Sequence, residues 1–246
     1  MELSWIIPLA GGVAAAIGLF LSKPERPRWA LATLILLLVT SGWQAAAEYS
    51  AARTTRALQL RAHRELVIST NRLLGLHARM HGESTDGWLP ASEDEFFSSR
   101  LVESICLNLD LDAPALVTPS QSWGKHSAWV ASGVRRTYRE VLATSGPYLD
   151  SELVDAVSRI DASFLMLLLT MRTEYPSQPF PANLCLGVEE QVNEAVPHLR
   201  RVYHLLNKRE SLNGLSVTDP WLDFANPTYD SIMGRSRFSN TRAGAG

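Results

Sequence analysis

Histidines and cysteines are the side chains of this sequence that could do chemistry at neutral pH. His77 and His81 are four residues apart in a segment with helical spacing, so both imidazoles would lie on one helix face, as a metal site requires. Glu83 follows closely, but a zinc site needs a third well-placed ligand, and His63 lies about four helical turns away. We therefore expect these histidines to be solvated side chains on a basic helix surface.

The two cysteines, Cys106 and Cys185, are far apart and lack the spacing of a metal site. A nucleophilic cysteine needs nearby positive charge and an oriented base, whereas the charges near Cys106 are Glu103 and Asp110, which would raise its pKa. We expect Cys106 to be a buried structural residue. Cys185 precedes an expected helix but has no visible histidine or aspartate partner. Two thiols do not make a disulfide framework, so the sequence leaves the redox compartment open.

No other pattern in the sequence indicates catalysis. There is no phosphate-binding loop, dinucleotide fingerprint or supported Ser-His-Asp order. The acidic run at 93–95 is explained by the preference of carboxylates for the start of a helix. The sequence therefore predicts no catalytic, cofactor-binding or metal-binding residue. A net charge of -2 also argues against a general nucleic-acid-binding protein.

The strongest charge pattern is basic. Residues 49–81 contain six arginines against a single acidic residue, Glu65; the arginines are Arg53, Arg56, Arg61, Arg64, Arg72 and Arg79. The first four follow an apolar run closely and could contact anionic lipid head groups or a partner. The alternative is a solvated helix face. Residues 82–112 are acidic and offer a second possible partner for the arginines, within the chain or between subunits.

Two uncharged apolar runs, at about 3–22 and 29–47, stand before this basic segment. As helices, both are long enough to cross a hydrocarbon core of about 30 Å, so residues 1–48 are expected to form a transmembrane hairpin. Small residues in the first run could let helices pack closely. These residues are Gly11, Gly12, Ala15, Ala16 and Gly18. The alternative is that glycine and alanine are simply common in membrane helices.

The signals for membrane orientation conflict. Three basic residues in the turn at 23–28 favour a cytoplasmic turn and an outward-facing domain. Four arginines between 53 and 64 favour the opposite orientation, because a basic helix suits the anionic cytoplasmic leaflet. On balance we expect a two-span protein of a bacterial inner membrane whose helical domain is cytoplasmic.

The rest of the chain has helical periodicity, and the predicted fold class is all-α. A basic amphipathic helix is expected at 49–81, then a helical bundle at 82–233 and a disordered tail at 234–246. Within the bundle, helices are predicted at about 93–109, 121–144, 150–171 and 188–212. Pro197 should kink or split the last of these helices. No strand is predicted.

These features favour a membrane-anchored interaction or sensor protein without a catalytic site. Its expected partners are the bilayer and either another protein or a second copy of the chain. The alternative function is a membrane-perturbing two-span effector of bacterial antiphage defence, an analogy with the architecture of such effectors that no motif supports. A third and weaker hypothesis is a membrane-anchored enzyme that uses Cys185 or the pair His77 and His81.

Overall fold

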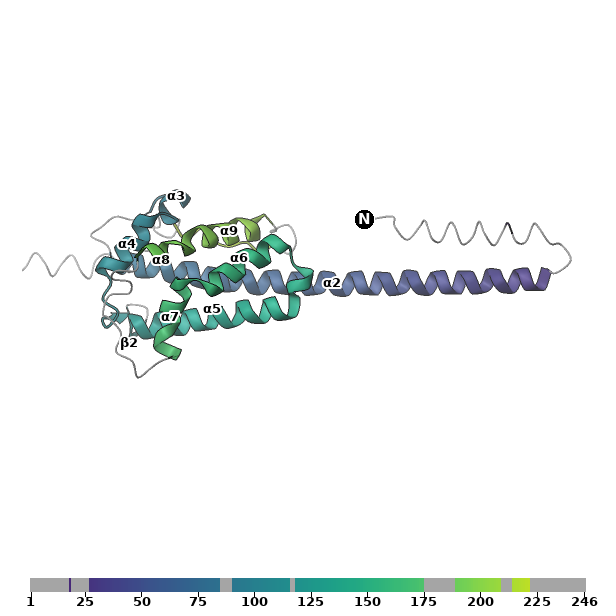
Figure 1. Ribbon diagram of the computed structural model, residues 1–246, viewed down its shortest axis with the longest axis horizontal. Coiled ribbons are helices and arrows are strands. Elements are labelled where there is room, and N and C mark those ends of the chain that lie inside the picture. Colours follow the sequence, from purple (N-terminus) through teal and green to yellow (C-terminus); the bar gives the residue numbers. More distant parts are fainter. Residues whose placement is uncertain are drawn as a thin grey trace, which may run out of the picture. The chain divides into compact units, whose positions relative to one another are not determined.

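The structure is a computed structural model that describes residues 18, 27–84, 90–115, 118–174, 189–208 and 214–221, without the side chains of 27–30, 32–34, 172–174 and 189. The described part is helical apart from one short hairpin, which confirms the all-α prediction (Figure 1). The chain divides into two compact units, Met1–Leu58 and Gln59–Gly246.

The longest element is helix α2, Pro27–Ser84, which runs without a break for 58 residues. It joins the predicted second span to the predicted basic helix. After residue 58 its predicted apolar stripe is buried, which confirms that stripe as a core face; the buried residues are Ala62, Leu66, Ser69, Leu73, Leu76 and Met80. The helix ends at Ser84, three residues beyond the predicted end at residue 81, and the Ser84 hydroxyl donates to the His81 carbonyl (2.9 Å).

The predicted transmembrane hairpin is described only in part. Residues 3–22 lie outside the described residues apart from Gly18, which is helical. The predicted second span at 29–47 falls within α2, where most of the described large apolar side chains are exposed. Among the residues that the structure describes, no helix is both long and apolar enough to cross a membrane.

The helix predicted at 93–109 is divided into α3, Glu93–Phe96, and α4, Ser99–Asn108. Ser92 caps α3, as the sequence predicted, by accepting from the Glu95 N–H at 3.3 Å. A hairpin that was not predicted follows α4. Its strands are β1, Pro114–Ala115, and β2, Thr118–Ser122, paired antiparallel.

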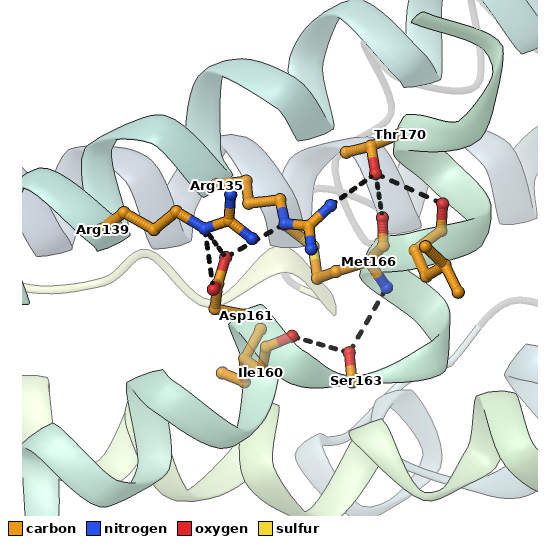
Figure 2. A network of polar contacts seen from close by, with 8 residues as sticks. Arg135, Arg139, Ile160, Asp161, Ser163, Met166 and Thr170 are labelled. Atoms are coloured by element: carbon orange, nitrogen blue, oxygen red, sulfur yellow. Dashed lines mark hydrogen bonds and ion pairs between the residues drawn. The ribbon is translucent and has the colours of Figure 1, made fainter. Parts of the chain in front are cut away.

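Helix α5, Trp123–Ser145, matches the predicted helix within two residues and leads into the 3-10 turn η1, Gly146–Tyr148. The single helix predicted at about 150–171 is wrong, because two helices form: α6, Ser151–Ala162, and α7, Phe164–Glu174. Ser163 separates them. Its hydroxyl donates to the Ile160 carbonyl (2.7 Å) and accepts from the Met166 N–H (3.3 Å), so one side chain serves both helix ends (Figure 2).

The last helical segment is split into α8, Glu189–Asn193, and α9, Ala195–Asn207. This split confirms the role predicted for Pro197, which has no N–H to donate to the Asn193 carbonyl one turn earlier. Within the second unit, α5 packs against α7 and α6 packs against α9. Val217 and Trp221 of the segment 214–221 are buried against this bundle.

Candidate functional site

The arginines predicted to contact lipid or a partner are exposed. Arg53, Arg56 and Arg64 have exposed side chains on α2, and Arg61 pairs with Glu65 one turn later (2.9 Å). Arg53 and Arg56 belong to the first unit and Arg61 and Arg64 to the second. Nothing in the structure tests what these arginines contact.

The acidic segment at 82–112 does have a basic partner, but on a different helix from the one predicted. Glu93 accepts from Arg200 of α9 (2.7 Å) and lies 2.8 Å from His204, while Asp94 also pairs with Arg200. Within the described residues, these ion pairs join α3 to α9 rather than to the arginines of α2. At Glu93 and Asp94, the acidic segment 82–112 is therefore paired with α9 and not with the basic segment 49–81.

The small residues proposed for helix packing lie mostly outside the described part of the chain. Gly11, Gly12, Ala15 and Ala16 are not described. Gly18 is exposed, and a Cβ added there would meet no described atom within 4 Å.

The expectation that His77 and His81 are solvated is wrong, because both are buried, and His63 is buried as well. The helix is covered on more sides than its apolar stripe indicated. His63 Nε2 lies 3.0 Å from the Leu206 carbonyl of α9. His77 borders a void with Cys106 and Val192 of about 10 Å³, at most the size of one water. Burial, aided by the charge of His81, lowers the pKa of His77 to about 4.

Among the residues that the structure describes, no group of three or more histidine, cysteine, aspartate or glutamate side chains could hold a metal ion.

Cys106 is fully buried, as expected, but it is disulfide-bonded. The only other cysteine in the sequence is Cys185, which lies outside the described residues. A sulfur held in a buried disulfide is not available as a nucleophile, so Cys106 has a structural role. The bond also bears on the compartment, which the sequence left open.

The most site-like feature of the second unit is an open groove of about 800 Å³ between α2 and α5. Drug-sized and cofactor-sized ligands occupy pockets of roughly 300–1,000 Å³. Helix α2 contributes Asn71, Arg72, Gly75, Leu76 and Arg79, and helix α5 contributes His126, Trp129, Val130, Ser132, Gly133 and Arg136.

Two contacts fix how the helices run past each other. Thr70 Oγ1 lies 2.9 Å from the Tyr138 hydroxyl, and further along α2 the charge of Arg79 acts on the imidazole of His126. The residue number therefore rises on α2 as it falls on α5, so the two helices are antiparallel.

This register defines what faces what across the groove. We count from the contact between Thr70 and Tyr138, upward in residue number on α2 and downward on α5. Each step moves about 1.5 Å along the groove on both helices. The opposing pairs are then Arg72 with Arg136, Gly75 with Gly133, and Arg79 with Trp129. The groove has one doubly basic end, a middle lined by glycines, and one end that is aromatic and basic.

The groove carries positive charge that no described lining residue compensates. Three arginines line it and no carboxylate does. None of Arg72, Arg79 and Arg136 forms an ion pair within the described part of the chain, in contrast to Arg135 and Arg139 on the same helix α5, which bind Asp161 (Figure 2). The groove therefore attracts anions.

Two aromatic side chains complete the aromatic end. Trp129 is 70% exposed although it is a large apolar residue. His126 is buried, with Nδ1 3.2 Å from Thr118 Oγ1 and with Nε2 lacking any hydrogen-bond partner among the described residues. Burial, and then the charge of Arg79, lower the pKa of His126, which favours the neutral form of this imidazole.

The sequence analysis missed this groove, although a signal for it exists. Trp129, Gly133 and Arg136 recur at helical spacing opposite the core stripe of 123–145, and Arg72, Gly75 and Arg79 do the same on α2. Each stripe alone is typical of a solvated helix face. Only the pairing of two helices separated by about fifty residues of sequence turns the stripes into two walls of one groove.

Comparisons with protein-family models, curated proteins and solved structures found no match to this chain.

Proposed function

We propose that this protein is a membrane-anchored helical sensor or interaction protein without a catalytic site of its own. Its N-terminal residues hold it at the bilayer, and its second unit binds an anionic ligand or partner in the groove between α2 and α5. The observation that carries the proposal is the uncompensated charge of Arg72, Arg79 and Arg136 beside an exposed tryptophan, Trp129.

The packing of α2 and α5 in the core supports a preformed binding site in the groove. The sides of both helices that face away from the groove are packed in the core: Leu73 and Leu74 of α2 and Val134 and Tyr138 of α5 are buried. Such packing holds the two walls rigidly, and a rigid, preformed site loses little entropy when it binds.

Membrane attachment is supported by the apolar side chains early in α2. No ionisable residue occurs between Trp29 and Ala47. The exposed large side chains in this stretch are Leu31, Ile35, Leu36, Leu38, Val39 and Trp43. At about 100° per residue they spread over roughly 160° of the helix circumference, which is wide for a soluble surface helix. A lipid environment would cover them.

The disulfide at Cys106 supports an orientation opposite to the one expected from the sequence. Disulfides persist on the oxidising side of a membrane and are rare in the cytoplasm. The three basic residues of the turn at 23–28 would then lie in the cytoplasm, in agreement with the positive-inside rule. The proposal therefore places the second unit on the outer face of the membrane.

A substitution at Gly133 tests the groove without disturbing the core. A Cβ at Gly133 meets nothing within 4 Å, so a longer side chain can extend into the groove from the helix surface. The Gly133→Glu variant adds a carboxylate that competes with an anionic ligand for the arginines. The Gly133→Gln variant has nearly the same shape but no charge and serves as the matched control. Both replace a poor helix former, so both should fold.

The measurement is thermal unfolding of the full chain in detergent with a panel of anionic, neutral and cationic compounds. Anionic compounds should raise the unfolding temperature of the wild type and of Gly133→Gln, because a ligand that binds the folded state stabilises it. They should not stabilise Gly133→Glu. The proposal is wrong if no anionic compound stabilises the wild type, or if Gly133→Glu responds as the wild type does.

A further inference from the structure

We propose that the groove is built for one class of anion: a ligand with a phosphate at one end and a planar ring at the other, as in a nucleoside phosphate. This inference rests on the proposed function, because it names the ligand of the same groove. It comes from the different chemistry at the two ends of the groove.

The end defined by Arg72 and Arg136 is suited to phosphate. The helix register puts residues 72 and 136 at the same level on the two walls, so a phosphate between them can accept from both guanidinium groups. Asn71, next to Arg72, adds neutral donors. Its Oδ1 accepts from the backbone N–H (2.9 Å) and the hydroxyl (3.1 Å) of Thr218. The carboxamide is thereby oriented, which leaves the two N–H groups of Asn71 as donors.

The other end is suited to a ring. The exposed indole of Trp129 offers a flat face, and base–aromatic stacking typically contributes about 5- to 150-fold in affinity. Arg79, opposite Trp129, can lie over the same ring or bind a second phosphate. His126 also lines this end, and its buried Nε2 has no hydrogen-bond partner among the described residues, so it can bind a polar atom at the edge of a ring.

The middle of the groove has the right length and width for such a molecule. Arg72 and Arg79 are seven residues apart on α2, which corresponds to about 10 Å along the helix. That distance is of the order of the separation between the phosphate and the base in an extended nucleotide. Gly75 and Gly133 face each other between the two ends, and both have open space where a side chain would lie. The glycines thus leave room for a linking sugar.

The experiment measures binding of ADP, pyrophosphate and adenosine to the full chain in neutral phosphatidylcholine nanodiscs by calorimetry. The variants are Arg136→Gln at the phosphate end and Trp129→Ala at the ring end, with Arg64→Gln as a control for an exposed α2 arginine outside the groove. ADP should bind more tightly than either pyrophosphate or adenosine. Arg136→Gln should weaken ADP and pyrophosphate by about tenfold or more. Trp129→Ala should weaken ADP by about tenfold and leave pyrophosphate unchanged. Arg64→Gln should bind as the wild type does.

Three results overturn the inference. If pyrophosphate binds as tightly as ADP and Trp129→Ala changes neither, the groove binds anions without recognising a ring, and the proposed function stands alone. If ADP does not bind, while nanodiscs that contain phosphatidylglycerol stabilise the wild type and not Gly133→Glu, the phosphate belongs to a lipid head group. If no anion binds in either kind of disc, both the inference and the proposed function are wrong.

Discussion

At the scale of single residues, His77 is the side chain whose surroundings most change its chemistry. Its imidazole is buried, its Nδ1 has no hydrogen-bond partner among the described residues, and its pKa is lowered to about 4. The folded protein therefore keeps His77 neutral where an unfolded chain, with a histidine pKa near 6.5, would bind a proton. A depressed histidine pKa of this kind makes the folded state less stable as the pH falls.

Removing the imidazole of His77 should therefore change how stability depends on pH. Above pH 6.5 neither state binds the proton, and between about pH 6.5 and 4 only the unfolded state does. Stability should fall by about 1.4 kcal/mol per pH unit across that window, about 3 kcal/mol in total. In His77→Leu this contribution should be absent. Melting temperatures of the full chain from pH 7.5 to 4.5 give the comparison, and parallel curves for the two proteins would contradict it.

A second residue-scale prediction concerns Gly133, which costs helix stability without any packing reason. It lies within α5, its φ is not positive, and a Cβ there would meet nothing within 4 Å. Gly133→Ala should stabilise the fold by about 0.5–1 kcal/mol, because alanine is the better helix former. A melting temperature lower than that of the wild type would mean that the glycine is needed for the fold itself rather than for an open groove.

The residues that the sequence analysis placed correctly are those whose environment depends on one helix. The α2 stripe from Ala62 to Met80 follows from its own spacing, and it is buried. His77 and His81 were misplaced because their burial comes from other helices that cover further faces of α2. The disulfide of Cys106 was also missed, because the helical spacing around this residue carries no sign of a covalent bond.

At the scale of elements, an ion-pair network joins helices α5, α6 and α7. The sequence analysis predicted only two helices in this part of the chain, at 121–144 and 150–171. Asp161 accepts from Arg135 (3.2 Å) and Arg139 (3.0 Å) of α5, and Arg135 also donates to Thr170 of α7 (3.0 Å) (Figure 2). Asp161 lies at the end of α6, two residues before the break at Ser163. The network therefore fixes the angle at which α7 leaves α6 and packs on α5.

Neutralising Asp161 should be costly compared with an exposed aspartate on the same helix. The side chains of Asp161 and Arg135 are only 17% and 16% exposed. Asp161→Asn leaves Arg135 half-buried without its counter-charge, and we expect a loss of about 2–3 kcal/mol. The control is Asp155→Asn, which removes an exposed pair with Arg159 and should cost less than about 0.5 kcal/mol. Equal melting temperatures for the two variants would show that the network adds nothing to stability.

The helix breaks show which element boundaries the sequence can predict. The split at Pro197 was foreseen because a missing N–H is a property of one residue. The break at Ser163 was not, since the apolar spacing continues across it and only the caps and the Asp161 network favour the turn. The hairpin at 114–122 was also missed. It contains two prolines, and it is held partly by backbone bonds from Trp123 and Gly124 to the loop before it.

At the scale of the whole molecule, the two proposed roles of the first unit differ in what they require of the second. As an anchor, the first unit only holds the groove at the membrane. As a membrane-perturbing effector, it would have to change the bilayer when the groove is occupied. This alternative stays a hypothesis that a membrane-potential dye can test: depolarisation of cells that express the wild type, but not Gly133→Glu, would support it.

The last prediction concerns the side of the membrane on which the second unit lies. The disulfide favours the outer face, whereas the basic helix favours the cytoplasm. An alkaline phosphatase reporter fused after Gly246 should be active, since this enzyme needs an oxidising compartment, and a fluorescent-protein fusion should be dark. In the untagged chain, Cys106 should resist maleimide in denaturant until a reductant is added. A bright fluorescent fusion with a freely labelled Cys106 would place the domain in the cytoplasm, as the arginines at 53–64 favour. That outcome would mean that the charge of the exit helix outweighs the turn at 23–28 in setting the topology.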